Sequence, residues 1–306
     1  KKQFFMKLFL YCILFFVLLS YQETNAQVYF KTEYITSSSY RGEKEDNLHA
    51  KGNLKVIQGG FRVPLSLKMD ENKRPTVWAI GCSGAHATMD NKKLPKELCP
   101  SKMLNLQFGL IHSRPLNAKW SMLATVGVGL YMDNDNLSKA SWNNVLGQGG
   151  VIFIRHLRPN LDLGAGVALS NTFGFPMILP AFYLTWNLEG RYDVKVSFVD
   201  AVRVSAGMHL NKYLKLSLIA EMNGILALTE KDGKDMYFTQ QYVIVGLQPE
   251  ITIAKSLSLA ATAGITPVRS AFYSKRSLKE LFSDDDESDP YFKIGFYCSL
   301  GLTWKF

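Results

Sequence analysis

The residues that could do chemistry are few and widely spaced in this sequence. Its histidines form no HExxH pattern, and no GxSxG nucleophile motif is present. Gly127 and Gly129, like Gly164 and Gly166, are two residues apart, which is a strand spacing and not that of a phosphate-binding loop. The sequence therefore predicts no enzyme, no catalytic residue, no metal site and no cofactor. The five histidines are His49, His86, His112, His156 and His209.

An acidic run near the C-terminus is a second candidate for chemistry. Such oxygen-rich clusters suit calcium, but the spacing and the glycine of an EF-hand are missing. We therefore expect a solvated loop tip, preceded by one helical turn over residues 277–282. The run consists of Asp284, Asp285, Asp286, Glu287 and Asp289.

The N-terminus predicts export. Met6 and Lys7 begin a short basic region, an apolar core reaches Tyr21, and small residues end at Ala26. The apolar run is shorter than the roughly 20 residues that a transmembrane helix needs. We therefore expect residues 1–26 to be a signal peptide that is cleaved after Ala26, and residues 27–306 to form the mature protein.

Charge and cysteine content exclude several classes of protein. The mature chain would carry 32 basic and 25 acidic residues, a mild net charge of +7, and its lysines and arginines lie mostly in expected turns, so no nucleic-acid partner is predicted. Three cysteines remain after processing, Cys82, Cys99 and Cys298. An odd number without metal-ligand spacing predicts neither a disulfide framework nor a zinc site, although a bridge between Cys82 and Cys99 stays open.

Alternation of apolar with polar or small residues runs through the chain after residue 26. Residues 103–111, for example, place Leu104, Leu106 and Phe108 on one face. A period of two predicts strands and not amphipathic helices. We expect fourteen strands, or twelve if residues 193–210 are irregular, and a bulge near Gly147. The expected strands are 27–36, 54–67, 76–88, 103–111, 119–131, 145–155, 161–170, 177–186, 193–198, 202–210, 214–228, 237–253, 257–267 and 291–306.

The expected connections alternate between short and long. This pattern is typical of an outer-membrane barrel, which has short periplasmic turns and longer extracellular loops. An even number of strands returns both termini to the periplasm. The sequence therefore predicts an all-β fold, a transmembrane antiparallel up-and-down β-barrel. The longer connections are expected at 37–53, 89–102, 132–144, 171–176, 229–236 and 268–290.

The positions of the tryptophans are consistent with a barrel whose short turns face the periplasm. Trp78, Trp120, Trp186 and Trp304 fall near the expected periplasmic strand ends, and Trp142 falls near an extracellular one. Outer-membrane barrels carry such aromatic girdles at both membrane interfaces. Aromatic core residues of a soluble β-sandwich could produce the same pattern.

The last segment, 291–306, alternates throughout and ends on an aromatic residue, with its apolar row including Phe292, Ile294 and Phe296 predicted to face lipid. Ser299, Gly301, Trp304 and Phe306 resemble the C-terminal signal of bacterial outer-membrane barrels. That resemblance implies recognition by the barrel-assembly machinery. The alternative is the last strand of a soluble β-sandwich that happens to end in phenylalanine.

Three further segments resemble an uncharacterised outer-membrane β-barrel family of Bacteroidota. They read LIHSRPLNAKWSML, PNLDLGAGVALS and ILPAFYLTWN, and the resemblance covers roughly residues 103–306. It implies the fold and a location in the outer membrane, in contact with lipid and lipopolysaccharide. No activity or solute is implied.

If alternation assigns the faces, the barrel interior contains charges of both signs. A fourteen-stranded barrel is too wide for side chains alone to fill, so we expect a passive channel for small hydrophilic solutes. A transporter of hydrophobic solutes is favoured instead if Ile111, Leu123, Leu179 and Ile219 converge inside. The predicted lumen residues are Lys31, Glu33, Arg62, Asp162, Arg203, Lys215, Glu221, Glu250 and Lys293.

Two alternatives from other classes remain. A surface-binding or structural barrel would have a sealed lumen, and its function would depend on the loop at 268–290. A hydrolase at the barrel rim would need one histidine within hydrogen-bond reach of a serine or carboxylate on neighbouring strands.

Overall fold

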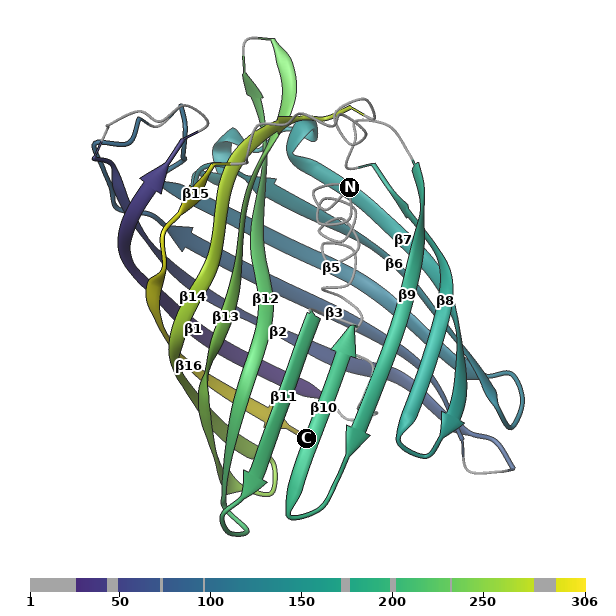
Figure 1. Cartoon of the computed structure of the whole chain (residues 1–306). Helices are drawn as coiled ribbons and strands as arrows, with labels where there is room; N and C mark the ends of the chain where they lie inside the picture. The colour runs from purple at the N-terminus through teal and green to yellow at the C-terminus, as the bar shows by residue number, and fades with distance from the viewer. Residues whose placement is uncertain are drawn as a thin grey trace.

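The computed structural model describes residues 26–42, 49–71, 74–95, 97–171, 177–198, 202–231, 233–277 and 290–306. They form one antiparallel sheet that closes on itself, because β1 pairs with both β2 and β16. Fourteen strands make the wall (Figure 1), and the two-residue strands β4 and β15 are additions at one rim. The prediction of a fourteen-stranded barrel is confirmed.

Each expected segment contains a strand, although several strands run further than expected, β14 by eight residues. The fourteen wall strands are β1 Gln27–Arg41, β2 Lys51–Met69, β3 Pro75–Thr88, β5 Lys102–Pro115, β6 Trp120–Met132, β7 Val145–Arg158, β8 Leu161–Ser170, β9 Met177–Leu188, β10 Tyr192–Phe198, β11 Val202–His209, β12 Leu214–Lys231, β13 Lys234–Ala254, β14 Leu257–Lys275 and β16 Gly295–Lys305. The additions are β4 Asn91–Lys92, β15 Tyr291–Phe292 and two 3-10 turns, η1 Leu137–Lys139 and η2 Trp142–Asn144.

Among these residues, no helix is long and apolar enough to cross a membrane.

Both ends of the barrel sequence lie at one rim, where Gln27 pairs with Lys305. The connections at this rim are short, and include residues 116–119 and 159–160. We call this rim the turn end and the opposite rim the loop end. The loop end carries the longer connections, among them residues 89–101 and 133–144.

The outer surface is apolar because every second side chain points outward. On β16, Phe296, Leu300 and Trp304 are 72%, 47% and 50% exposed, whereas Tyr297 between them is 3% exposed. Burying such rows in lipid removes apolar surface from water at about 25 cal/mol per Å². A barrel also leaves no unpaired backbone edge inside the bilayer. The sequence pattern and the closed sheet therefore describe the same transmembrane wall.

Two predictions, a bulge near Gly147 and a loop at 229–236, are wrong. The expected bulge near Gly147 is absent from the described pairing, since β6 and β7 keep one register from Trp120↔Arg155 to Leu130↔Val145. The shift lies instead between His156 and Arg158, against β8. The expected loop at 229–236 is also wrong, because β12 and β13 pair as far as Lys231↔Lys234 and leave two connecting residues.

The final strand is not continuous, which corrects the predicted outward face of Phe292. The pairing of β1 is irregular between Ile35 and Ser38, and the chain opposite breaks between β15 and β16. Phe292 consequently points inward and is 1% exposed, with its ring 5.1 Å from that of Tyr40. The guanidinium carbon of Arg269 lies 4.0 Å from the same ring centroid. Ile294, in the break, is 63% exposed.

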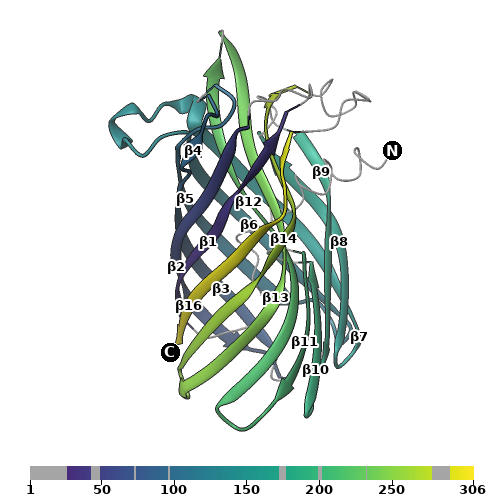
Figure 2. The same ribbon diagram turned by 60° about the vertical axis from the view of Figure 1, so that its left-hand side comes forward.

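At the loop end, β12 leaves the wall and crosses toward the opposite side. Its pairing with the short strand β11 stops at Met222↔Val202, so the edge of β12 beyond this point needs other partners. Leu228 forms a parallel bridge with Met132 of β6, and its carbonyl accepts a hydrogen bond from Asn144 Nδ2 at 2.8 Å. Figure 2 shows β12 and β13 rising between β5 and β14. The interior is therefore divided at this end, although the width expected for fourteen strands predicted an open one.

A buried arginine fixes β14 near the same rim. Arg269 is fully buried and donates to the carbonyls of Gly52 and Asn53 at 3.0 and 2.8 Å. These carbonyls belong to β2, whereas β14 lies on the far side of β1 and β16. Burial of an arginine requires such hydrogen bonds because an unpaired charge is costly inside a protein.

Candidate functional site

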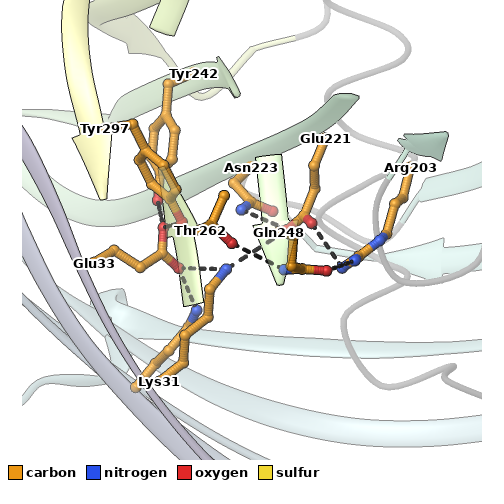
Figure 3. Close-up of polar contacts among 10 residues, drawn as sticks. Lys31, Glu33, Arg203, Glu221, Asn223, Tyr242, Gln248, Thr262 and Tyr297 are labelled. Atoms are coloured by element: carbon orange, nitrogen blue, oxygen red, sulfur yellow. Dashed lines mark hydrogen bonds and ion pairs between the residues drawn. The ribbon is translucent and has the colours of Figure 1, made fainter. Parts of the chain in front are cut away.

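The inner face of the barrel divides into two walls of different chemistry. From mid-height to the turn end, inward side chains of β1, β2, β11, β12, β13, β14 and β16 are mostly polar or charged, and we call them the polar wall. Toward the loop end these strands also contribute to a second buried apolar cluster, which includes Leu54, Ile225 and Phe238. Inward side chains of β5 to β9 are largely aliphatic around mid-height, and we call them the apolar wall. Ten residues of the polar wall form one connected network (Figure 3), which consists of Lys31, Glu33, Gln58, Arg203, Glu221, Asn223, Tyr242, Gln248, Thr262 and Tyr297.

Glu33 is the first centre of this network and is 2% exposed. Gln58 Nε2 donates to its Oε1 at 2.6 Å, and Lys31 Nζ lies 3.0 Å from the same oxygen. The hydroxyls of Tyr242 and Tyr297 both donate to Oε2 at 3.1 Å. Four donors from four strands therefore compensate the desolvation of one carboxylate.

Glu221 is the second centre. Arg203 Nη1 donates to its Oε2 at 2.9 Å, and Asn223 Nδ2 donates to its Oε1 at 2.8 Å. Lys31 Nζ lies 3.7 Å from Oε1 and so joins the two centres. β1 and β12 are separated in the sheet by β16, β14 and β13. The contact therefore crosses the interior and does not follow the wall.

Arg203 extends the network along the sheet. Its Nη2 donates to Gln248 Oε1 at 2.6 Å, and Gln248 Nε2 donates to Thr262 Oγ1 at 2.9 Å. The Arg203 side chain is 39% exposed, whereas that of Glu221 is 9% exposed. The positive end of this pair is thus the more accessible group, and it can meet a solute that enters the interior.

The apolar wall contains three of the four residues whose convergence would favour a hydrophobic solute. Ile111, Leu123 and Leu179 point inward and belong to one buried cluster, which also contains Ile152. Ile219 also points inward and is 2% exposed, but it lies outside that cluster. Porin interiors are usually polar, so an aliphatic inner wall is a specific feature of this barrel.

A separate ion pair lies at the turn end. Lys215 Nζ is 2.6 Å from Asp193 Oδ2, and Asp193 is 3% exposed. Gly207 lies beneath this pair. A Cβ at position 207 would come within 2.6 Å of Asp193 Oδ1 and of Ser217 Oγ. The absence of a side chain at Gly207 therefore gives the ion pair its space.

Of the remaining predicted lumen residues, Asp162, Arg62 and Glu250 lie near the turn end, and Lys293 lies in the break between β15 and β16. Asp162 is near the turn end, where its Oδ1 is 2.7 Å from His156 Nδ1. Arg62 pairs with Gln27 near the same rim, and Glu250 lies opposite Lys215 on β13. Lys293 is exposed in the break between β15 and β16, so strand alternation does not assign its face.

The predicted girdle residues lie near strand ends. Trp78, Trp120, Trp186 and Trp304 are near the turn end and are 37% to 50% exposed, whereas Trp142 lies in η2 at the loop end and is 87% exposed. His112 stacks on Trp78 with ring centroids 4.0 Å apart. It is thus part of the outer aromatic surface.

The four predicted signal residues lie on β16 and directly after it. Ser299 and Gly301 are on the inward row, and the rings of Trp304 and Phe306 are 5.1 Å apart. Their recognition by an assembly machinery stays a prediction.

Sequence reasoning missed most partners of the two carboxylates. Gln58, Tyr242 and Asn223 are neutral, so a search for charged residues does not find them. Tyr297 carried a usable signal, because it is a large side chain on the otherwise small or polar inward row of the last strand. His156 gave no local motif, since its partners come from β6 and β8.

Several predictions fall outside the described residues, namely the signal peptide up to residue 25, the acidic run at 284–289 and most of the helical turn at 277–282. The three described cysteines are free, and Cys99 Sγ lies 3.6 Å from Met89 Sδ. Burial raises the pKa of the Cys99 thiol to about 11. The structure therefore contains no bridge between Cys82 and Cys99.

A closed sheet of fourteen antiparallel strands, apolar outside and partly charged inside, defines a transmembrane β-barrel of the outer-membrane type. A family model described as a domain of unknown function (DUF6268) matches residues 22–305, and the chain belongs to this family. A search of curated proteins found no match.

Solved outer-membrane barrels are among the structures similar to this chain. An outer membrane channel from Pseudomonas putida F1 is 11% identical with a TM-score of 0.43, covering 94% of this chain and 97% of that one. The toluene transporters TbuX of Ralstonia pickettii and TodX of Pseudomonas putida are 8% and 9% identical, with TM-scores of 0.38 and 0.37. Each alignment with these transporters covers 96% of this chain and 93% of the other. These likenesses concern the type of fold only.

Proposed function

We propose that this protein is a passive outer-membrane channel for small amphipathic solutes. The observation that carries the proposal is the division of the interior into a polar and an apolar wall. A solute with one polar end and one apolar side would find a polar partner in the Arg203–Glu221 pair and an apolar one in the wall around Leu123, whose side chains are buried in this structure and must part to admit it. The turn end would face the periplasm and the loop end the exterior, as in other outer-membrane barrels.

The chemistry of the two walls sets the expected selectivity. Arg203 is the more exposed member of its ion pair, so it is suited to meet an anionic or polar group. The aliphatic row of Ile111, Leu123 and Ile152 is 1% to 7% exposed, so it would contact a hydrocarbon portion only after the packed wall opens. Small-molecule sites generally combine an apolar lining with a few placed polar groups. The charged residues alone predicted a hydrophilic solute. With the apolar wall included, we propose an amphipathic solute instead.

The loop end would limit the size of the solute. β12 bridges to β6, and Thr229 Oγ1 donates to Asp133 Oδ2 at 2.8 Å. These bonds hold the extension of β12 across the interior. We expect a low conductance that rises when they are removed, for example in Thr229→Val combined with Asn144→Ala.

The test is conductance of the refolded barrel in planar bilayers. Glu221→Lys should shift the cation-to-anion permeability ratio toward anions, because it reverses the charge beside Arg203. Lys234→Glu is the matched control, since Lys234 is exposed in the β12–β13 hairpin at the loop end. Discrete channels whose selectivity follows position 221 and not position 234 would support the proposal. Bilayers that stay silent over a wide voltage range, for the wild type and the loop-end variant alike, would favour a non-conducting barrel.

The contribution of the apolar wall needs its own assay. Liposomes containing the wild type or Leu123→Asn would be compared for entry of a short alkyl carboxylate and of a polar solute of equal size. We expect the variant to lose preference for the alkyl carboxylate by several-fold, because the substitution replaces apolar contact surface by an amide. Equal loss of entry for both solutes would indicate a simple blockage and contradict the role of this wall.

A further inference from the structure

A serine, a histidine and an aspartate are connected on the inner face near the turn end. Ser121 Oγ lies 2.7 Å from His156 Nε2, and His156 Nδ1 lies 2.7 Å from Asp162 Oδ1. The three residues come from the adjacent strands β6, β7 and β8. They belong neither to the polar network nor to the ion pair of Asp193.

Strand pairing brings these side chains together. Ser121 is opposite Ile154 on β7, and His156 follows two residues later on the same inward row. His156 is in turn paired with Asp162 on β8. The irregular pairing between His156 and Arg158 begins directly after this pair. The order across three strands is therefore hydroxyl, imidazole, carboxylate.

The connection uses the two ring nitrogens in the way that nucleophile activation requires. A carboxylate that accepts from Nδ1 fixes the tautomer and leaves Nε2 free to accept the serine proton. Ser121 is 7% exposed, whereas the side chains of His156 and Asp162 are 36% and 27% exposed. A distance of 2.7 Å is within the reach of a general base.

Apolar side chains border this group on one side. Leu123 follows Ser121 on the inward row of β6, and Ile154 precedes His156 on the inward row of β7. Each is 1% exposed, and both belong to the cluster of the apolar wall. An apolar chain that inserts along this wall, by displacing what now buries Leu123 and Ile154, would place its polar end at Ser121.

We propose that Ser121, His156 and Asp162 form a nucleophilic site for carboxylic esters with an apolar acyl chain. Ser121 Oγ gives its proton to His156 Nε2 and forms a bond to the ester carbonyl carbon. The bond from this carbon to the alkoxy oxygen then breaks, and the departing alcohol takes the proton from His156. Water then attacks the acyl carbon and passes one proton to His156 Nε2. The bond from the acyl carbon to Ser121 Oγ breaks, the carboxylic acid leaves, and Oγ takes the proton back from His156. Asp162 is the positioning residue.

The barrel wall limits how fast such a site can work. The backbone around Ser121 takes part in regular pairing with β5 and β7. Stabilisation of the oxyanion therefore depends on side chains and not on free backbone N–H groups. We accordingly expect slow turnover, and the primary readout is covalent labelling of the nucleophile.

The experiment uses the full barrel refolded in detergent and an alkyl fluorophosphonate as the probe. Ser121 Oγ should displace fluoride from phosphorus, and mass spectrometry should locate the adduct at Ser121. Ser205 is the internal control, because it is equally buried, points inward on β11 and is opposite Ile219. A soluble serine hydrolase in the same detergent shows that the probe is active there.

Four variants separate nucleophile activation from a structural hydrogen bond. Ser121→Ala should abolish the adduct, and His156→Gln should slow labelling by about 100-fold. Asp162→Asn should slow it by about 10-fold, whereas Asp162→Glu should restore most of the rate. Heat-modifiable migration in gels checks that each variant is a folded barrel. A merely structural bond would change the folded fraction and leave the labelling of Ser121 independent of His156.

Probe length tests the predicted substrate class. An octyl fluorophosphonate should label Ser121 faster than an ethyl one, and the ratio of the two labelling rates should fall toward one in Leu123→Asn. Absence of an adduct at Ser121 in the folded wild type would overturn the proposal. So would a labelling rate that is the same in His156→Gln. Neither result depends on whether the barrel conducts.

Discussion

The two inner walls are built from the same kind of strand and yet differ in how they are held together. The polar wall depends on specific bonds, since Glu33 accepts from four side chains, and Glu221 accepts from Arg203 and Asn223 and forms an ion pair with Lys31 at 3.7 Å. The apolar wall depends on packing among Ile111, Leu123 and Ile152. Outward rows on both sides are similarly apolar. The comparison shows that lipid constrains one face of every strand and leaves the inner face free to specialise.

The two walls also differ in how far apart the contacting residues are in the sequence. The partners on the polar wall come from distant strands, as with Tyr242 and Glu33, which are 209 residues apart in the chain. On the apolar wall, paired strands follow one another in sequence, as Leu123 and Ile152 do on β6 and β7. A polar wall of this kind forms only when the barrel closes. Most contacts of the apolar wall can form between neighbouring strands, and only those with Leu226, Leu228 and Tyr237 of β12 and β13 require closure of the barrel.

The largest effect is expected from Glu33→Ala on the polar wall. It leaves Lys31, Gln58 and two tyrosine hydroxyls without their shared acceptor, and breaking such a buried charged group costs about 3–5 kcal/mol. The free energy of unfolding would be measured by urea titration in lipid vesicles. Glu33→Gln, which keeps an acceptor oxygen, should lose clearly less. A loss below about 1 kcal/mol for the alanine variant would mean that the contacts of Glu33 contribute little to the free energy of unfolding.

The matching change on the apolar wall is Leu123→Ala, with a smaller expected loss. Leu123 is 1% exposed, so removal of its side chain should lower the free energy of unfolding by about 2–3 kcal/mol. Leu137→Ala is the control, because Leu137 is 55% exposed in η1 and should change stability by less than about 0.5 kcal/mol. Equal losses at the two leucines in the same urea titration would contradict a packed inner wall.

Gly207→Ala tests the space beneath the turn-end ion pair. The new Cβ would come within 2.6 Å of Asp193 Oδ1 and within 2.7 Å of Lys215 Cε, so we expect a loss of about 1–3 kcal/mol from overpacking. Gly147→Ala provides the comparison, since nothing lies within 4 Å of a Cβ there. Both variants would be measured in the same vesicles. A stable Gly207→Ala barrel would show that Lys215 can move aside.

The smallest effect is a pH dependence at the loop end. Lys102 Nζ lies 2.7 Å from Asp135 Oδ2, and the hydrogen bond from Lys102 holds the pKa of the Asp135 carboxyl below its usual value. A depressed pKa means that this contact stabilises the loop above the ordinary carboxyl range, and that the contribution is lost as the pH falls through the lowered pKa. The exposed Trp142 in the same connection can report the change by fluorescence.

Two controls isolate this transition. Asp135→Asn should remove the acid transition of the Trp142 signal, and Trp142→Phe should identify its source. A transition that persists unchanged in Asp135→Asn would assign it to another carboxyl group.

Much of the fold could be predicted because alternation is a local property. The rows of β5 and β16 that face lipid are visible in the residues themselves, and the short turns and the even number of strands follow from the same pattern. The errors lie where tertiary contacts override that pattern. Phe292 follows the apolar row of the last strand in sequence, yet it packs inward against Tyr40 and Arg269. β12 and β13 remain paired through the predicted loop.

The candidate sites were less predictable for the same reason. Charged residues such as Arg203 and Glu221 could be assigned to the interior by alternation, but their bonding partners could not. Ser121, His156 and Asp162 carry no motif, because β6, β7 and β8 each contribute one residue. A pair separated by 35 residues, as Ser121 and His156 are, becomes visible only when the register of two strands is known.

By itself, the sequence determined which face of each strand meets lipid, because every outward residue contacts the membrane individually and needs no partner. It also predicted fourteen strands, with twelve as the alternative, and the rim at which both ends of the barrel sequence meet. The tertiary structure alone decided which inward residues bond, where β12 crosses the interior and how the two walls oppose each other. Those outcomes depend on the closure and stagger of the whole sheet, which no single strand specifies.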